Sequence, residues 1–129
     1  MTCRGIRGAI CVDENEACDI VQATQTLLLE MVDTNSVRTE EVASILFTAT
    51  PDLDAAYPAR GAREMGWTHI PLMCAQEMSV KGSLSRCIRV LLMWNTELSQ
   101  DQIQHIYLGK ARQLRPDWAQ QLAGEEEET

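Results

Sequence analysis

Three polar side chains within one stretch of sixteen residues are of types that could act together in a chemical step. The segment CAQEMSVKGSLSRCIR begins with the thiol of Cys74, continues through the carboxylate of Glu77 and ends with the guanidinium of Arg89. Arg89 opens the run RVLLMW, which is typical of a strand buried on both faces. Alternation along a strand predicts that Arg89 shares a face with Leu91 and Met93. A charged group among such neighbours requires a partner.

Arginine keeps its proton when it is buried, so Arg89 must meet a carboxylate, a group of carbonyls or an anionic ligand. Two interpretations stay open: a structural ion pair with a nearby Asp or Glu, and an arginine directed at a bound anion. Glu77 could be that ion-pair partner, a general base or a surface charge. Alternation puts Cys74 and Glu77 on opposite faces, so both can line one site only if the backbone bulges or turns between them.

Other kinds of catalytic site find little support. A nucleophilic Cys74 would need a general base, and neither His69 nor His105 has an evident orienting partner. We therefore expect Cys74 to be a buried thiol that donates a weak hydrogen bond, and His105 to be a core or interface histidine. The sequence has no P-loop, G-x-G-x-x-G, G-x-S-x-G or H-E-x-x-H motif, which argues against a nucleotide cofactor and against the familiar hydrolases.

The composition suggests a small anionic ligand rather than a nucleic acid or a membrane. The formal net charge is −8, which disfavours nucleic acid and anionic lipid as partners, although the run Glu125 to Glu128 exaggerates the acidity. Nine of the eleven basic residues are arginines, the side chain suited to planar binding of carboxylate or phosphate. A set of surface salt bridges would give the same composition.

Cysteine usage and the apolar runs point to the cytoplasm and to a chain without metal. Five cysteines with no C-x-x-C pair and no histidine at ligand spacing predict free thiols and no metal site. The apolar runs are far too short to cross a bilayer. The first ten residues, MTCRGIRGAI, do not resemble a signal peptide.

The pattern of apolar and polar residues predicts the elements that must position these groups. They form one α+β domain with a mixed sheet, one long helix and one short helix. Arg7 projects from the face of the first strand that also carries Gly5 and Ala9, as a ligand-binding group or as a solvated strand-end charge. Arg60 and Arg63 share one face of the short helix without an acidic partner four residues on, which hints at an anion. The expected segments are the strand Cys3 to Val12, a helix capped within Asp13 to Glu16 and ending near Asn35, the strand Val42 to Thr50, a short helix from Tyr57-Pro58, an extended segment Thr68 to Met73, the strand Arg86 to Asn95, a capped turn at Ser99 to Gln102 and the segment Ile103 to Leu114.

The predicted helices are too few to cover both faces of the sheet. A strand such as Arg89 to Trp94 needs apolar cover on each side. We therefore expect a homo-oligomer in which other copies supply the missing cover, with sites at subunit boundaries.

Several motifs together resemble those of the monofunctional chorismate mutases of the AroH class. They are RGIRGA, ATPDL before Tyr57-Pro58-Ala59, CAQEM, CIRVLL, QDQIQHIYL and LRPD, and they span Thr2 to about Asp117 in the family's order and spacing. The resemblance implies a homotrimer (a pseudo α/β barrel) whose three sites lie between subunits. It also implies that chorismate rearranges there to prephenate without a cofactor, in phenylalanine and tyrosine biosynthesis.

The implied reaction is a pericyclic Claisen rearrangement, which needs no protonation and no nucleophile, so fixed charges and a compact substrate conformation are what the protein can supply. By resemblance, Arg89 would hydrogen-bond the developing ether oxyanion and Glu77 would hold the ring hydroxyl. Cys74 would contact the same part of the substrate through its backbone or thiol. Arg7 and Tyr107 would bind carboxylate oxygens.

The resemblance also assigns residues to an adjacent subunit and to a closing segment. Tyr57, Arg60 and Arg63 would reach in from the neighbouring chain, and Arg115 would belong to a segment that closes over the occupied site. The remaining positions assigned to the substrate pocket are Met73 and Leu114. We expect residues 1–117 to form the domain and residues 118–129 to form an acidic, flexible tail. The alternative is a non-catalytic trimeric module that binds a small carboxylate metabolite at its subunit interfaces.

Overall fold

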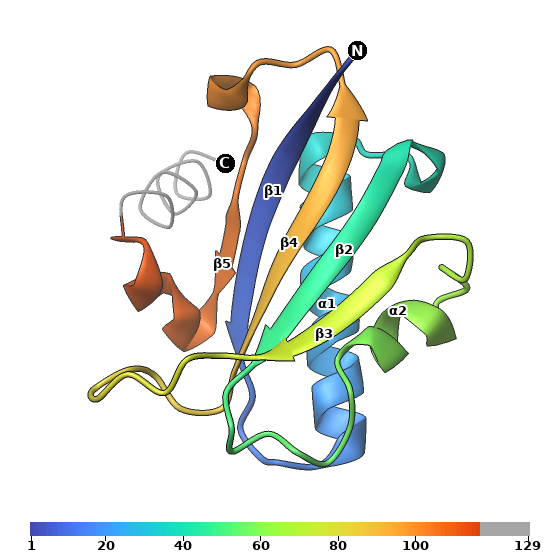
Figure 1. Cartoon of the computed structure of the whole chain (residues 1–129). Helices are drawn as coiled ribbons and strands as arrows, with labels where there is room; N and C mark the ends of the chain where they lie inside the picture. Colours follow the sequence, from blue (N-terminus) through green and yellow to red (C-terminus); the bar gives the residue numbers. More distant parts are fainter. Residues whose placement is uncertain (117–129) are drawn as a thin grey trace.

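A five-stranded mixed sheet forms the centre of the computed structural model, which describes residues 1–116 (Figure 1). The sheet has the order β3-β2-β4-β1-β5. Its central strand β4 is antiparallel to β1 and β2, whereas the edge strands β3 and β5 are parallel to their neighbours. The elements are β1 (Thr2–Cys11), α1 (Ala17–Asn35), η1 (Thr39–Glu41), β2 (Val42–Ala49), α2 (Ala59–Glu64), β3 (Leu72–Gln76), β4 (Cys87–Thr96), η2 (Gln100–Gln102), β5 (Ile106–Leu108) and η3 (Gly109–Leu114), where η marks a 3₁₀ helix. The α+β class and the mixed sheet are confirmed.

Helix α1 covers one face of the sheet, where the main core forms (Figure 1). Its buried positions include five apolar or small residues that recur at helical spacing in the sequence, namely Ile20, Thr24, Leu27, Leu28 and Met31. The helix comes close to β1 because Gly8 has no side chain: a Cβ there would lie 2.4 Å from Sδ of Met31. The sequence pattern therefore identified the packing face of α1 correctly.

The N-cap of this helix lies within the predicted range Asp13 to Glu16, but no side chain caps it. The N-cap residue is Glu16, and its side chain makes no capping hydrogen bond. The side chain of Asn15 instead holds the loop before α2. Its Nδ2 donates to Oδ1 of Asp54 at 2.7 Å, and its Oδ1 accepts the backbone N–H groups of Asp54 and Ala55 at 3.1 Å each. The polar residues before α1 thus connect two loops rather than cap a helix.

Residues 1–116 cover the sheet face opposite α1 only in part. We call it the open face; it carries Arg7, Thr48, Arg89, Leu91 and Tyr107, as the strand registers place them. The predicted alternation of β4 is correct, but burial on both faces is wrong for the single chain, because Leu91 is 36% exposed. Large apolar side chains therefore lie at the surface on this side.

The described residues include no α-helix with the length and apolar character needed to cross a bilayer. The acidic run Glu125 to Glu128 and the predicted tail 118–129 lie outside the described residues.

Candidate active site

Arg89 and Glu77 face each other on the open face as a loose ion pair. Nε of Arg89 lies 3.6 Å from Oε2 of Glu77, and the two side chains are 33% and 23% exposed. Nε of Arg89 is itself buried and has no hydrogen-bond partner among residues 1–116. The pair is thus neither fully buried nor hydrogen-bonded. A donor remains available beside a carboxylate that solvent can reach.

Thr48 holds the carboxylate of Glu77 in place. Its Oγ1 donates to Oε2 of Glu77 at 2.7 Å, and Thr48 stands directly opposite Arg89 in the register of β2 and β4. The backbone N–H of Glu77 donates to the carbonyl of Ala49 at 2.9 Å, just beyond the end of β3. Glu77 is therefore anchored through both its backbone and its side chain. Sequence reasoning missed Thr48, because the pairing of β2 with β4 is not visible in either segment alone.

Ala9 separates Arg89 from Tyr107 on the open face. It pairs with Arg89 on β4 and with Tyr107 on β5, so the two polar side chains lie on either side of a methyl group. Tyr107 is only 2% exposed, and Leu114 of η3 packs against the small cluster that contains Ala9 and Tyr107. Tyr107 and Leu114 therefore lie beside β1, the strand that pairs with β4 at Arg89.

His105 accepts a hydrogen bond from the backbone of Arg7 and feels the charge of Arg115, which follows η3. Its Nδ1 accepts the backbone N–H of Arg7 at 3.0 Å. Burial lowers the pKa of His105, and the charges of Arg7 and Arg115 lower it further. The imidazole is therefore held neutral between two cationic side chains. Sequence reasoning expected a core or interface histidine here, and the structure adds that it supports the backbone at Arg7.

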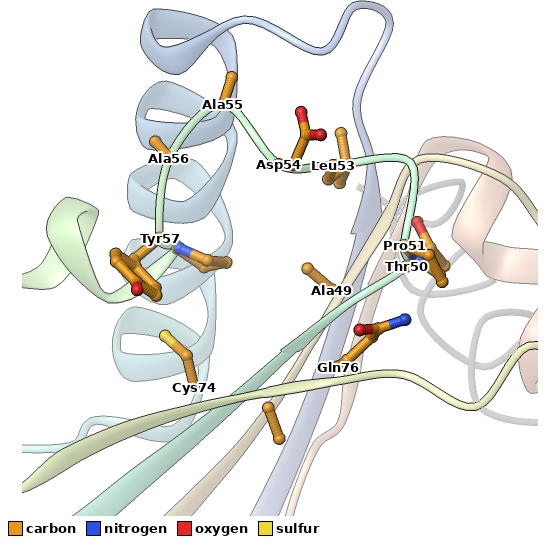
Figure 2. A pocket seen from close by; sticks show the side chains of 12 residues that line it. Ala49, Thr50, Pro51, Leu53, Asp54, Ala55, Ala56, Tyr57, Cys74 and Gln76 are labelled. Carbon is orange, nitrogen blue, oxygen red and sulfur yellow. The ribbon is translucent and has the colours of Figure 1, made fainter.

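Cys74 points away from Arg89 and Glu77. Its place opposite Phe47 in an unbroken register puts its side chain on the α1 side of the sheet. There it lines a pocket of about 510 Å³ together with Tyr57 and Gln76, and Figure 2 shows the Cys74 side chain directed toward Tyr57. Neither Arg89 nor Glu77 lines this pocket. Met73, the residue before Cys74 on β3, lies on the open face and is 68% exposed.

Arg60 and Arg63 lie on α2, beyond the β3 edge of the sheet (Figure 1). The expectation that they lack an acidic partner is wrong for Arg60, whose Nε lies 2.9 Å from Oε1 of Glu64, four residues on. Arg63 is exposed and makes no ion pair or hydrogen bond with another side chain of residues 1–116. Tyr57 is also exposed, at 70%. The chain therefore does not bring these three side chains to Arg89.

The width of the sheet separates Tyr57, Arg60 and Arg63 from Tyr107. β3 and β5 are opposite edges of the sheet, and four strand spacings of about 4.8 Å make about 19 Å between them. A single small ligand cannot contact α2 beyond one edge and Tyr107 at the other edge of the same chain.

The described residues hold no group of three or more His, Cys, Asp or Glu side chains arranged for a metal ion. All five cysteines are free thiols. Near Arg89, the open face therefore offers a cation, the carboxylate of Glu77 and the hydroxyl of Thr48.

Comparison with known proteins supplies the family. The profile of the family described as chorismate mutase type I matches residues 3–118. The chain is 50% identical over 115 residues to Chorismate mutase AroH of Thermus thermophilus, covering 88% of this chain and 94% of that protein. It is 46% identical over 118 residues to Chorismate mutase AroH of Bacillus subtilis, covering 91% and 93%. The solved structure of a chorismate mutase from Clostridium thermocellum superposes with a TM-score of 0.82 at 49% identity, covering 84% of this chain and 96% of that one. The chain belongs to the type I chorismate mutase family.

Proposed function

We propose that this protein catalyses the rearrangement of chorismate to prephenate, without a cofactor, in the biosynthesis of phenylalanine and tyrosine. Membership of the type I family supports the reaction, and so do the names of its relatives. The observation that carries the proposal is the donor on Nε of Arg89, buried without a hydrogen bond and 3.6 Å from Glu77. A buried donor left unsatisfied costs about 1–3 kcal/mol, and a substrate oxygen would remove that cost.

The two charges suit a transition state that separates charge. As the ether bond breaks, negative charge grows on its oxygen and positive charge grows on the ring. Arg89 stabilises the oxygen, and Glu77 holds the ring hydroxyl near the electron-poor carbon atoms. Both groups are fixed before the reaction, so little reorganisation is needed when the charges develop. The hydrogen bond from Thr48 to Glu77 contributes to that fixed geometry.

The carboxylates of the substrate would be bound at the β1 and β5 side of the open face. Arg7, Tyr107 and Arg115 provide two cations and a phenol there, and Leu114 provides an apolar contact. Because the reacting bonds form only in a compact conformer, holding both carboxylates restricts the substrate to it. The reaction requires no proton transfer, so it needs no nucleophile paired with a base.

Each site is shared between subunits of a homotrimer in this proposal. Tyr57, Arg60 and Arg63 of one chain complete the site formed by Arg89 of its neighbour. The separation of about 19 Å across the sheet supports this arrangement, and so do the exposed apolar side chains Leu46, Met73 and Leu91 on the open face. Met73 then lies at the contact between chains. Cys74 contributes through its backbone, because its thiol lies on the other side of the sheet.

The test is an assay of the purified protein with chorismate, in which loss of chorismate absorbance is followed and prephenate is identified as the product. We expect turnover without added metal or nucleotide. A folded protein that leaves chorismate unchanged would contradict the proposal. Saturable binding of chorismate without turnover would favour the non-catalytic carboxylate-binding module, which the comparisons do not favour because the named relatives are mutases.

We place the enzyme in the cytoplasm. Five free thiols in the described part of the chain suit a reducing compartment, where disulfides are rare. Expression with a fluorescent tag, followed by cell fractionation, tests this placement.

A further inference from the structure

Two cysteines face each other across neighbouring strands on the open face. Cys11 ends β1 and Cys87 begins β4, and the two are direct partners in the antiparallel register. The strands lie side by side along their whole length (Figure 1). Neither thiol takes part in the proposed rearrangement.

The local hydrogen bonding shows which kind of pair this is. The N–H of Val12 donates to the carbonyl of Arg86 at 2.7 Å, so Val12 and Arg86 occupy a hydrogen-bonded position of the ladder. Positions alternate, which makes Cys11 and Cys87 a non-hydrogen-bonded pair. In such pairs the Cα atoms are about 4.5 Å apart and the side chains are closest. That distance lies within the range of about 4.4–6.8 Å found for disulfides.

The backbone around this pair is held on both sides. The N–H of Cys87 donates to Oγ1 of Thr50 at 2.9 Å, and its carbonyl accepts the N–H of Thr50 at 3.0 Å. The N–H of Arg86 donates to both carboxylate oxygens of Asp52, at 3.1 and 2.9 Å. These hydrogen bonds hold the backbone of Cys87 in the position that the register with Cys11 gives it.

The two thiols differ in exposure. Cys87 is 3% exposed, whereas Cys11 is half-buried. Burial, and then the neighbouring Cys11 thiol, raise the pKa of Cys87 to about 12, with a smaller opposing effect of Arg89. Cys87 therefore remains protonated at neutral pH, and the more accessible Cys11 is the thiol that meets an oxidant first.

We propose that Cys11 and Cys87 form a reversible redox modification site, in which a peroxide oxidises the pair to a cross-strand disulfide. The thiolate of Cys11 attacks one peroxide oxygen; the O–O bond breaks, hydroxide leaves and takes up a proton, and Cys11 becomes a sulfenic acid. Cys87 then gives up its proton, and its thiolate attacks the sulfur of Cys11; the S–O bond breaks, and the hydroxide that leaves takes up this proton to become water. Two thiols and one peroxide yield one disulfide and two waters.

The site lies next to the groups assigned to the substrate. Cys87 is two residues from Arg89 on the same face of β4, and it packs in one cluster with Ala9 and Tyr107. An opening that admits a substrate to Arg89 also admits a molecule as small as hydrogen peroxide. The oxidation itself does not depend on the proposed function, because its test measures only free thiols and peptide masses and not enzymatic activity.

The experiment treats the full-length protein with hydrogen peroxide, blocks remaining thiols with N-ethylmaleimide and maps the peptides. A Cys18→Ser background is used, because trypsin otherwise leaves Cys11 and Cys18 on one peptide. We expect the peptide of Cys11 to be joined to the peptide of Cys87 with a loss of 2 Da, and dithiothreitol to restore both thiols.

Two substitutions supply the controls. Cys87→Ser should abolish the cross-link and leave Cys11 to be oxidised further, whereas Cys3→Ser, at an exposed and distant thiol, should leave the cross-link unchanged. Alkylation of both Cys11 and Cys87 at peroxide doses that oxidise Cys3 would overturn the proposal. So would cross-linking of Cys11 between chains in place of the bond to Cys87.

Discussion

Oγ1 of Thr48 donates a 2.7 Å hydrogen bond to the same oxygen of Glu77 that lies 3.6 Å from Nε of Arg89. Thr48 and Arg89 are also direct partners between β2 and β4. The hydroxyl therefore keeps the carboxylate from closing fully onto the guanidinium. Nε of Arg89 has no hydrogen-bond partner among residues 1–116, and the proposed function therefore makes Thr48 a positioning residue for Glu77.

Replacing Thr48 by Val should lower kcat about tenfold. The change removes one hydrogen bond to a charged group, which is worth about 1.5–3 kcal/mol, and frees Glu77 to move toward Arg89. Steady-state kinetics with chorismate measure the effect, and Thr48→Ser, which keeps the hydroxyl, is the matched control. Equal loss in both variants, or none in Thr48→Val, would show that the hydrogen bond does not position Glu77.

Arg89→Lys should lower kcat by roughly 10²-fold or more, because a lysine cannot place the same fixed donor at the developing oxyanion. Single-turnover kinetics separate this loss from product release. Arg4→Lys serves as the control, since Nε of Arg4 binds the carbonyl of Leu98 away from the site. Near-normal turnover by Arg89→Lys would remove Arg89 from the catalytic role.

Arg63→Ala should raise KM about tenfold or more if this side chain binds a substrate carboxylate, while kcat changes less. A pure loss of kcat would contradict that assignment.

The same residue tests whether sites are shared between chains. At low chorismate concentration, mixed trimers of Arg7→Ala and Arg63→Ala chains should be more active than trimers of either variant alone. Some of their sites then combine an intact Arg7 from one chain with an intact Arg63 from the other. Light scattering verifies the assembly, and remixing Arg63→Ala with itself is the control. Verified mixed trimers without recovery would place each site within one chain.

Gly8→Ala should lower the free energy of unfolding by about 1–3 kcal/mol, the usual cost of overpacking a core. The added methyl group would lie 2.4 Å from Sδ of Met31 and 3.1 Å from Cδ1 of Leu27. Urea unfolding at one fixed protein concentration measures the change. Gly5→Ala is the comparison: its methyl group meets Cδ1 of Leu91 at 3.1 Å on the open face, where Leu91 can turn away. A smaller loss for Gly8→Ala than for Gly5→Ala would refute this packing.

The free energy of unfolding should decrease as the pH is lowered, because His105 then takes up a proton. Its pKa in the folded chain is below the ordinary 6.5, so the unfolded chain binds the proton more readily. The contribution of neutral His105 to the free energy of unfolding is fully present above pH 6.5. It is lost as the pH falls from 6.5 toward the lowered pKa of the folded chain. Unfolding free energies between pH 7.5 and 5.5 should decline more steeply for the wild type than for His105→Asn, which keeps an acceptor for Arg7. Equal slopes in the two proteins would assign the decline to other groups.

Local patterns predicted much of this chain because they depend on neighbours in sequence. The stripe of α1 from Ile20 to Met31 repeats with the helical period, and the alternation of β4 assigns Arg89 and Leu91 to one face. The isolated charge of Arg89 within an apolar strand also marked the candidate site before any contact was known. The motifs that resemble those of the family, and that occur in the same order, identified the other candidate residues.

Only the tertiary structure decided which of those residues meet. The register of β2 with β4 puts Thr48 opposite Arg89, and the register of β1 with β4 puts Cys11 opposite Cys87. These pairings join segments far apart in sequence, and a shift of one residue would move each side chain to the other face. The same alternation sends the Cys74 thiol to the α1 side. Thus the sequence by itself determined the residue types, the elements and the isolated cation, whereas packing between distant strands decided the geometry in which Arg89, Glu77 and Thr48 can act.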